Sequence, residues 1–399
     1  MTENPTLRIP RDPEDDFGSE IIERRRALVA AASGSRPEHL FGRAVAPSEA
    51  RGNIENFVGY AQVPVGLAGP LTVDTTLGAR EVLVPMATNE GAMVASYSRG
   101  MRLIGAAGGA RSRVVREELS QHPVLVYKDA REARAASEEI ARLEPELAAS
   151  VGQWTRHGSL VRVEPEILGR RLILRLLFRT QDAIGINMAA KAAEEISARV
   201  GRETGALERY VHGQDVEKRA NARALVEGRG RSVVCDVTIP ASTLEETLRT
   251  SPEAMEAIAR TYARGYAHMG TQNWAVQSAN GLAAVFTACG QDVAYITECA
   301  TGFLDLERTE DGDLYAAITL PSLLVGTVGG GALKGTAREC LELLGCTGDG
   351  KANHFAEILG AVILAGDLSL MAAFCAHEFV AAHERLGRNR PDSESRGSR

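Results

Sequence analysis

The pattern of apolar and polar positions along the chain points first to residues 280–292. These residues are apolar and mostly small until they end in a lone carboxylate, Asp292. Such a run is typical of a helix that other elements pack closely. A carboxylate at the end of a buried run is costly unless a cation or a hydrogen-bond network meets it. Two interpretations of Asp292 are therefore open: it has such a partner, or it ends the helix in solvent.

The first part of the chain mixes irregular and regular stretches. Residues 1–18 are polar and predict a loose arm, and residues 19–33 predict a short amphipathic helix. Residues 54–71 combine apolar residues with glycine and proline, which indicates an irregular packed segment. A strand is expected at residues 82–86.

The segment ATNEGAMVASYSRG predicts a helix after this strand. Thr88 or Asn89 is expected to cap the helix, with Glu90 in its first turn. A carboxylate there stabilises the helix dipole, which accounts for Glu90 without any chemistry. Four polar side chains recur along the same helix, namely Ser96, Ser98, Arg99 and Arg102.

Residues 123–211 differ from what surrounds them. Their patterns predict a strand, a helix, two strands joined at a glycine turn, a second helix and a last strand. This β-α-β-β-α-β order is that of a ferredoxin-like unit. We therefore expect an α+β protein in which a small domain is inserted into a larger, mostly helical one. The expected boundaries are an N-terminal arm with a helical segment (1–45), the large domain (46–122 and 212–370), the inserted domain (123–211), and a C-terminal helix with a disordered tail (371–399).

The second half of the chain is expected to be mainly helical. After a polar loop at 212–230 and a strand from 231, helices are expected from 243 to 296. Residues 320–331 form an apolar segment that ends in glycines, and further helices are expected at 335–345 and 352–386.

Composition narrows the class of protein. The chain has 399 residues, of which 44% are hydrophobic and 24% charged, as in globular proteins of two or three domains. The net charge of −7 predicts no general attraction to nucleic acid or membranes. We expect neither a signal peptide nor an apolar run long enough to span a bilayer, hence no membrane anchor. The cysteines show no CxxC spacing, so reduced core thiols in a cytoplasmic protein are expected, without a metal site: Cys235, Cys289, Cys299, Cys340, Cys346 and Cys375.

Basic side chains are almost all arginine, and only five are lysine: Lys128, Lys191, Lys218, Lys334 and Lys351. A lysine retained in such a chain draws attention because its compact ammonium differs chemically from a guanidinium.

Two glycine-containing segments are candidates for contact with a cofactor. GTVGGG, residues 326–331, follows an apolar run and precedes a helix, and DAIGINM, residues 182–188, opens another helix. Glycine turns let backbone N–H groups approach a phosphate, and a helix N-terminus attracts one. Each also has a simpler interpretation, as a tight turn and as an ordinary capped helix. His383, near the end of the last expected helix, is either a dipole partner or a proton donor.

Taken together, these segments resemble one family. ENFVGYAQVPVGLAGPL, TNEGAMVASYSRG, DAIGINM, VEGRGRSVVCDVTIP, ACGQD, LPSLLVGTVGGG, ECLELLG and AGDLSLMAAF are similar, in order, to the catalytic domain of the hydroxymethylglutaryl-CoA (HMG-CoA) reductases. The resemblance is to the first class of the family, because the second class has its lysine where this chain has Val276. It implies a ferredoxin-like nucleotide-binding insertion and a homodimer, or a dimer of dimers, with composite sites.

The resemblance implies reduction of a thioester to an alcohol by two hydride transfers from a nicotinamide cofactor. Glu90 matches the acid that protonates the carbonyl oxygen, and Lys218 matches the cation that stabilises the oxyanion. Asp292 matches the carboxylate that links the two, and His383 matches the acid that protonates the departing thiolate. Lys218 is still lysine, whereas its neighbour, a second lysine in the family, is Arg219.

The resemblance also implies the binding positions. Cofactor contacts are expected at Asp182, Ala183, Gly185, Ile186, Asn187, Met188, Gly326, Thr327, Gly329 and Gly330. Substrate contacts are expected at Ser96, Ser98, Arg99, Arg102, Gln121, His212, Arg219, Arg249, Arg260, Gln277 and Asn280.

The acyl pocket departs from the family pattern. The family has an arginine where this chain has Gln121, a histidine at Gln277, an aspartate at Glu217 and a Ser-Gly-Asn turn around His212. The arginine and serine hold the substrate's distal carboxylate and hydroxyl. Loss of a charge-assisted contact costs about 1.5–3 kcal/mol, enough to change the preferred substrate.

Three functions are therefore considered. The first is reduction of HMG-CoA to mevalonate and CoA with NADPH, or with NADH. The second is reduction of another acyl-CoA by the same machinery. The third, a non-catalytic CoA-binding or nucleotide-binding dimer, needs no Glu-Lys-Asp-His set.

Overall fold

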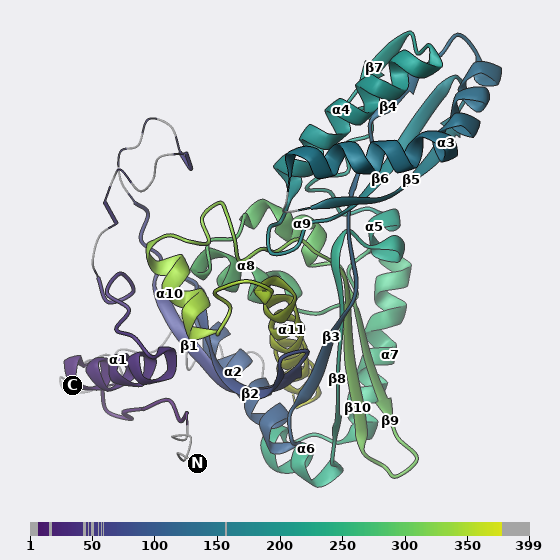
Figure 1. Ribbon diagram of the computed structural model, residues 1–399. Coiled ribbons are helices and arrows are strands. Elements are labelled where there is room, and N and C mark those ends of the chain that lie inside the picture. Colours follow the sequence, from purple (N-terminus) through teal and green to yellow (C-terminus); the bar gives the residue numbers. More distant parts are fainter. Residues whose placement is uncertain are drawn as a thin grey trace, which may run out of the picture.

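A computed structural model describes residues 7–15, 18–42, 45–46, 48, 52–54, 56, 58, 60–155 and 158–376 (Figure 1). Its strands are β1 (Val65–Thr75), β2 (Gly78–Ala87), β3 (Ala110–Gln121), β4 (Val124–Val126), β5 (Ser159–Leu168), β6 (Arg171–Arg179), β7 (Glu208–Tyr210), β8 (Gly230–Ile239), β9 (Phe303–Arg308) and β10 (Leu314–Leu323). Its helices are α1 (Ser19–Ser33), α2 (Met93–Ala106), α3 (Ala130–Trp154), α4 (Ile186–Thr204), α5 (Ala222–Glu227), α6 (Ala241–Leu248), α7 (Pro252–Met269), α8 (Ser278–Ala288), the 3-10 turn η2 (Val293–Tyr295), α9 (Ile296–Cys299), α10 (Gly335–Leu343) and α11 (Lys351–Cys375).

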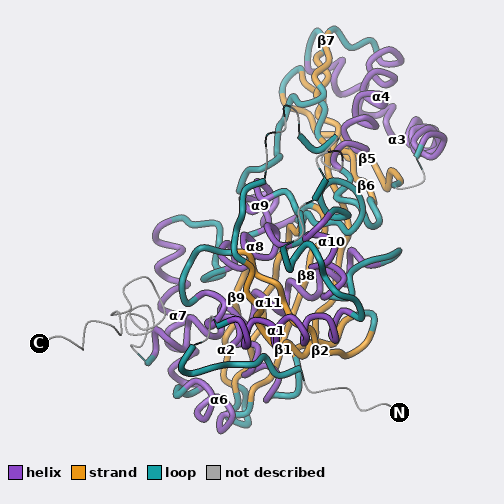
Figure 2. The backbone as a smooth tube through the Cα atoms, turned by 90° about the vertical axis from the view of Figure 1, so that its left-hand side faces the viewer, coloured by secondary structure: helices purple, strands orange, loops and turns teal. Residues whose placement is uncertain are grey.

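One ten-stranded sheet runs through the molecule in the order β7-β4-β6-β3-β8-β10-β9, with β5 on β6 and the β1–β2 pair on β3. Strand β3 is the connection, because its first residues pair with β8 and its last residues, Leu119–Gln121, pair antiparallel with β6. The elements α3, α4 and β4 to β7 stand at one end of the molecule, above the main body (Figures 1 and 2).

Helix α11 fills the centre of the main body and contacts α2, α7, α8, β1, β3, β8 and β10. It is long and apolar enough to cross a membrane by length and composition, so the expectation that no such run exists was wrong for residues 351–375. Most of this helix is buried inside the protein, and its buried carboxylates accept hydrogen bonds there. It therefore serves here as a core helix.

The large part of the molecule is mixed helix and sheet, which corrects the expectation of a mostly helical domain. Strand β1 was predicted as irregular because Gly69 and Pro70 interrupt its alternation; the register shifts between Ala68 and Leu71 accommodate them. The β9–β10 hairpin was missed because the apolar residues of β10 run on without alternation into residues 320–331. A strand buried on both faces has no period of two to detect.

Helix α2 begins later than the sequence indicated. Its first residue is Met93 and its N-cap is Ala92, with a φ of 69°, so Glu90 precedes the helix instead of occupying its first turn. Thr88 accepts a hydrogen bond from the Glu90 N–H at 3.0 Å, a local turn rather than a helix cap.

Candidate active site

Lys218 and Asp292 meet at the surface where the loop after β7 reaches the end of α8. The Lys218 Nζ lies 3.0 Å from Asp292 Oδ2, and both side chains are 43% exposed. The predicted contact between them is therefore present, although Asp292 is half-exposed and not buried. An exposed pair of this kind stabilises the fold by about 0–1 kcal/mol. The main effect of this pair is to hold the Lys218 ammonium group in a defined place.

Two buried charged residues, Glu298 and Arg229, hold the loop that carries Lys218. Glu298 is fully buried and accepts a hydrogen bond from the Lys218 backbone N–H. Arg229 Nη1 donates to both of its carboxylate oxygens, at 3.0 Å to Oε1 and 2.9 Å to Oε2. Arg229 Nη2 also lies 3.4 Å from Glu217 Oε1. Burial raises the pKa of Glu298, and the charge of Arg229 opposes that rise. These two residues were missed as site residues, although Glu298 is a lone acid in an apolar run and Arg229 lies in the quoted EGRG motif.

Gln121 lies at the edge of the same network. It is only 3% exposed and donates a hydrogen bond from Nε2 to Glu217 Oε1 at 2.9 Å. The amide of Gln121 is therefore paired with Glu217, the residue that precedes Lys218. Nearby, His212 is exposed, and Arg219 pairs at 3.1 Å with Asp215.

A second group of predicted residues, from α2 and the start of α8, lies against α11. Ser96 Oγ lies 3.1 Å from Ser369 Oγ, Arg99 Nε donates to the same hydroxyl at 3.0 Å, and Gln277 Nε2 reaches Ser96 Oγ at 3.4 Å. These bonds join α2, α8 and α11. The adjacent Asp367 accepts N–H bonds from Val276 and Gln277 at 2.9 Å each, and burial raises the pKa of its carboxyl to about 7.

The remaining predicted residues are placed separately. Glu90 is exposed, and no contact within the described ranges joins it to Lys218 or Asp292. Ser98 accepts from the Gly69 N–H at 3.3 Å, and Arg260 pairs with Glu256 on the outer face of α7. His383 lies outside the described residues. Arg102 and Arg249 are exposed, and Asn280 is half-buried.

The two segments predicted to contact a cofactor lie against each other. The Asp182 carbonyl accepts hydrogen bonds from the N–H groups of Thr327 and Val328, at 2.8 and 3.2 Å. Its carboxylate accepts from Gly350 and Ala352, at 2.8 and 3.0 Å, at the N-terminus of α11. Asp182 thus joins both segments to the core helix.

Glycine is required where these segments touch. A Cβ on Gly326 would lie 2.7 Å from the Ile184 backbone nitrogen. Gln291, beside Asp292, fixes the same glycine by donating to its carbonyl at 2.9 Å and accepting its N–H at 3.0 Å. The Lys218–Asp292 pair and the glycine segment are therefore parts of one connected structure.

The outer rim of these segments is open. Gly329 and Gly330 have positive φ, and a Cβ at either would meet no atom within 4 Å. Asn187 is exposed in the first turn of α4, and the N-cap residue Gly185 makes no side-chain capping bond, so the first N–H groups of the helix have no partner within it. The remaining predicted members, Ala183, Ile186 and Met188, are half-buried. An anionic cofactor fits such a rim, because its phosphates can reach backbone N–H groups.

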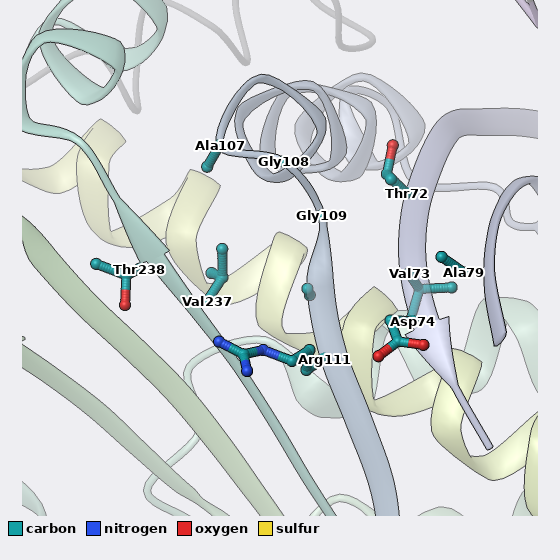
Figure 3. A pocket seen from close by; sticks show the side chains of 11 residues that line it. Thr72, Val73, Asp74, Ala79, Ala107, Gly108, Gly109, Arg111, Val237 and Thr238 are labelled. Carbon is teal, nitrogen blue, oxygen red and sulfur yellow. The ribbon is translucent and has the colours of Figure 1, made fainter.

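A pocket elsewhere contains none of the predicted residues (Figure 3). It lies where β1, β3 and β8 meet after α2, and Thr72, Asp74, Gly109, Arg111 and Thr238 are among its lining residues. These positions are at the ends of β3 and β8 opposite to Gln121 and Arg229.

Comparison with known proteins gives a consistent result. A family model described as hydroxymethylglutaryl-coenzyme A reductase matches residues 21–388. The 3-hydroxy-3-methylglutaryl-coenzyme A reductase of Pyrococcus horikoshii is 38% identical over 379 residues, covering 92% of this chain and 91% of the relative. That of Halobacterium salinarum is 41% identical over 342 residues, covering 84% of each. The class II reductase of Streptococcus pneumoniae, solved with NADPH bound in open conformations, has a TM-score of 0.72 at 21% identity, covering 88% of this chain and 96% of that chain, and shows the fold alone.

Proposed function

The chain belongs to the hydroxymethylglutaryl-coenzyme A reductase family, and from this we propose that it reduces HMG-CoA to mevalonate and CoA with NADPH. Curated relatives that cover most of its length carry this name, and the solved structure from Streptococcus pneumoniae is bound to NADPH. The observation within the chain that carries the proposal is the Lys218–Asp292 contact. A placed ammonium is what a thioester carbonyl needs when negative charge develops on its oxygen.

Each step assigns a task to a side chain. Lys218 donates a hydrogen bond to the carbonyl oxygen, and Asp292 holds the ammonium in place. Glu90 supplies the proton to that oxygen, and His383 protonates the departing CoA thiolate. NADPH, when bound, supplies the hydride. The exposed rim of Asn187, Gly329 and Gly330 would hold it, and the glycines leave room for its approach.

The assembly and the domain division belong to the same proposal. We infer a homodimer whose sites combine both chains, because Glu90 is exposed and makes no described contact with Lys218 or Asp292 of its own chain. Residues 123–211 are proposed as the inserted nucleotide-binding domain, since they supply α3, α4 and β4 to β7 at one end of the sheet. A cytoplasmic location is consistent with the free cysteines.

The direct test is NADPH oxidation by the purified protein with HMG-CoA, with mevalonate and free CoA measured as products. Two NADPH should be consumed for each CoA released. Lys218→Ala is expected to lose activity by about 10²–10³-fold with folding preserved, because one oxyanion donor is removed. Folded wild-type protein that oxidises no NADPH with HMG-CoA would overturn the assignment.

One observation favours a second candidate, reduction of a different acyl-CoA. Gln121 is buried and its amide is paired with Glu217, so the position offers no free cation to a substrate carboxylate. A panel of acyl-CoAs in the same assay separates the two. A higher kcat/KM for a thioester without the distal carboxylate would support this candidate.

A further inference from the structure

A single short segment makes three different contacts with Lys218. Asp292 lies 3.0 Å from the ammonium, the ring centroid of Tyr295 lies 5.0 Å from it, and Glu298 accepts the Lys218 backbone N–H. The three contacting residues are spaced by three, and η2 is a 3-10 turn at the start of this segment. A 3-10 turn has three residues per turn, so residues at this spacing lie along one face.

We propose that Tyr295 and Glu298 are positioning residues for Lys218: Glu298 fixes its backbone and Tyr295 fixes its ammonium group. Neither residue is assigned any role by the family resemblance given above. Asp292, the third member of the same face, is already placed in the reaction. The kinetic part of this inference rests on the proposed function, whereas the geometric part does not.

The backbone step concerns an unfavourable conformation. Lys218 has a φ of 57°, in the left-handed region that residues other than glycine rarely adopt. Its N–H is held there by Glu298, whose carboxylate is fixed by Arg229. Arg229 is in turn bound to Ser120 of β3 and to Ser322 of β10. A chain of hydrogen bonds therefore ties the Lys218 backbone to the central sheet.

The side-chain step concerns the direction of the ammonium. Tyr295 is buried and presents its ring to Lys218 Nζ, an arrangement in which a ring face attracts a cation. An ammonium has three N–H donors. With Asp292 and the ring on two sides, one direction remains for the substrate carbonyl. Removing the ring should let the flexible lysine chain follow Asp292 into solvent.

Lysine NMR tests the geometry without any substrate. The chain has only five lysines, so lysine labelled with ¹³C at Cε gives five signals, and Lys218→Arg identifies the one from Lys218. We expect a ring-current shift of that signal, lost in Tyr295→Leu and retained in Tyr295→Phe. Thr297→Ala is the matched control, because Thr297 is exposed on the same segment and bonds only the Ala294 carbonyl in the described contacts.

Kinetics test the consequence. We expect Tyr295→Leu to lower kcat by about 10- to 100-fold with unchanged KM for NADPH, because a small misplacement of a reacting group has this effect. Tyr295→Phe should restore most of the rate, and Thr297→Ala should leave it unchanged. If Tyr295 were only a core residue, Tyr295→Leu would lower the melting temperature without a selective loss of kcat, and this result would contradict the positioning role.

Glu298 needs its own variants. Glu298→Gln removes the buried carboxylate that pairs with Arg229 and leaves only the longer contact to Glu217, so this variant can fail to fold. Glu298→Asp keeps the charge but shortens the side chain, so Arg229 retains a partner while the Lys218 N–H loses its acceptor. A displaced Lys218 signal and a lower kcat are expected for this variant.

The outcomes separate the two proposals. Wild-type protein without reductase activity, but with the expected NMR shifts, would overturn the proposed function and support the positioning geometry. Active wild-type protein whose Lys218 signal and kcat are both unchanged in folded Tyr295→Leu and Glu298→Asp would overturn the positioning role.

Discussion

His122, the residue next to Gln121, is a buried histidine in a positive environment. It is 4% exposed, and neither ring nitrogen has a hydrogen-bond partner among the described residues. Burial, together with the charges of Arg223, Arg229 and Arg175, lowers the pKa of His122 from 6.5 to about 4. The neutral ring is therefore the form that the folded protein accepts near neutral pH.

This shift predicts a pH-dependent stability. Below pH 6.5 the unfolded chain protonates His122 while the folded protein does not, so the contribution of this group is present above pH 6.5 and is lost as pH falls through about 4. We expect His122→Phe to reduce the loss of unfolding free energy between pH 7 and pH 4 by up to about 3 kcal/mol. Urea unfolding of the wild type and of His122→Phe at several pH values measures this difference in unfolding free energy.

A comparison of variants isolates the effect, because other groups titrate in the same range. Burial also lowers the pKa of His354 to about 4, whereas Asp367, with its raised pKa of about 7, is stabilising at low pH and loses that contribution as pH rises through about 7. Exposed His268 provides the control substitution, His268→Phe. The explanation is wrong if both variants have the pH profile of the wild type.

Gln121 gives the second prediction at this scale. A guanidinium at this position is expected to attract the distal carboxylate of HMG-CoA, although Glu217 will compete for it. We expect Gln121→Arg to lower the KM for HMG-CoA by up to about tenfold, the equivalent of one charged hydrogen bond. Steady-state kinetics with HMG-CoA and with an acyl-CoA of similar size lacking the carboxylate measure the change. An equal change for both substrates would show that the charge is not what the pocket lacks.

Individual residues were predictable from the sequence to different degrees. The contact between Lys218 and Asp292 was predicted from the family resemblance, together with the cost of an unpaired acid after an apolar run; the run alone left a solvent position for Asp292 open. Glu298 and Arg229 were not, since the pairing of residues far apart in sequence depends on how the sheet brings them together. The turn at Glu90 was misassigned because Thr88 bonds locally instead of capping α2.

Helix α4 gives a prediction at the scale of an element. Asn187 is exposed in its first turn, at the open rim beside Gly329 and Gly330. An acidic side chain there stabilises a helix by about 0.3–1 kcal/mol through its dipole, yet it repels a phosphate. We expect Asn187→Asp to weaken NADPH binding by about tenfold while the melting temperature stays the same or rises. Titration of NADPH fluorescence and thermal unfolding give the two readings.

A matched control is Asn187→Gln, which changes the side chain without adding charge.

Gly185 is a poorer position for testing the cofactor site. Its φ is 83°, and a Cβ there would lie 2.3 Å from Thr180 Cγ2, so a valine would strain the fold itself. Unchanged NADPH affinity in Asn187→Asp would place the cofactor phosphates elsewhere.

Elements with a clear period were predicted well. The amphipathic helices α3 and α4 and the apolar strand β6 are present close to where their patterns placed them. Strands β1 and β10 were not predicted, because Gly69 and Pro70 interrupt the alternation of β1, and β10 is mostly apolar and buried on both faces. Sequence pattern reports the local burial of side chains, and both strands owe their form to pairing with distant partners.

At the scale of the whole molecule, the sheet connects the proposed cofactor and substrate regions. Strand β3 pairs with β8 at one end and with β6 at the other, and Gln121 lies where it passes from one to the other. The family resemblance implied a site shared between two chains, which no periodicity within one chain could show. The position of Glu90 makes this sharing testable.

The last prediction concerns a dimer with shared sites. If Glu90 of one chain completes the Lys218–Asp292 pair of its partner, a heterodimer of Glu90→Gln and Lys218→Ala chains has one intact site and one doubly altered site. Heterodimers isolated with two different tags should then have roughly half of the wild-type activity, although each homodimer is nearly inactive. The reciprocal control joins a wild-type chain to a chain that carries both substitutions. Shared sites leave this heterodimer nearly inactive, because each of its sites has one altered member, whereas sites within one chain leave it about half active. A reversal of the two activities would place Glu90 with Lys218 and Asp292 of its own chain.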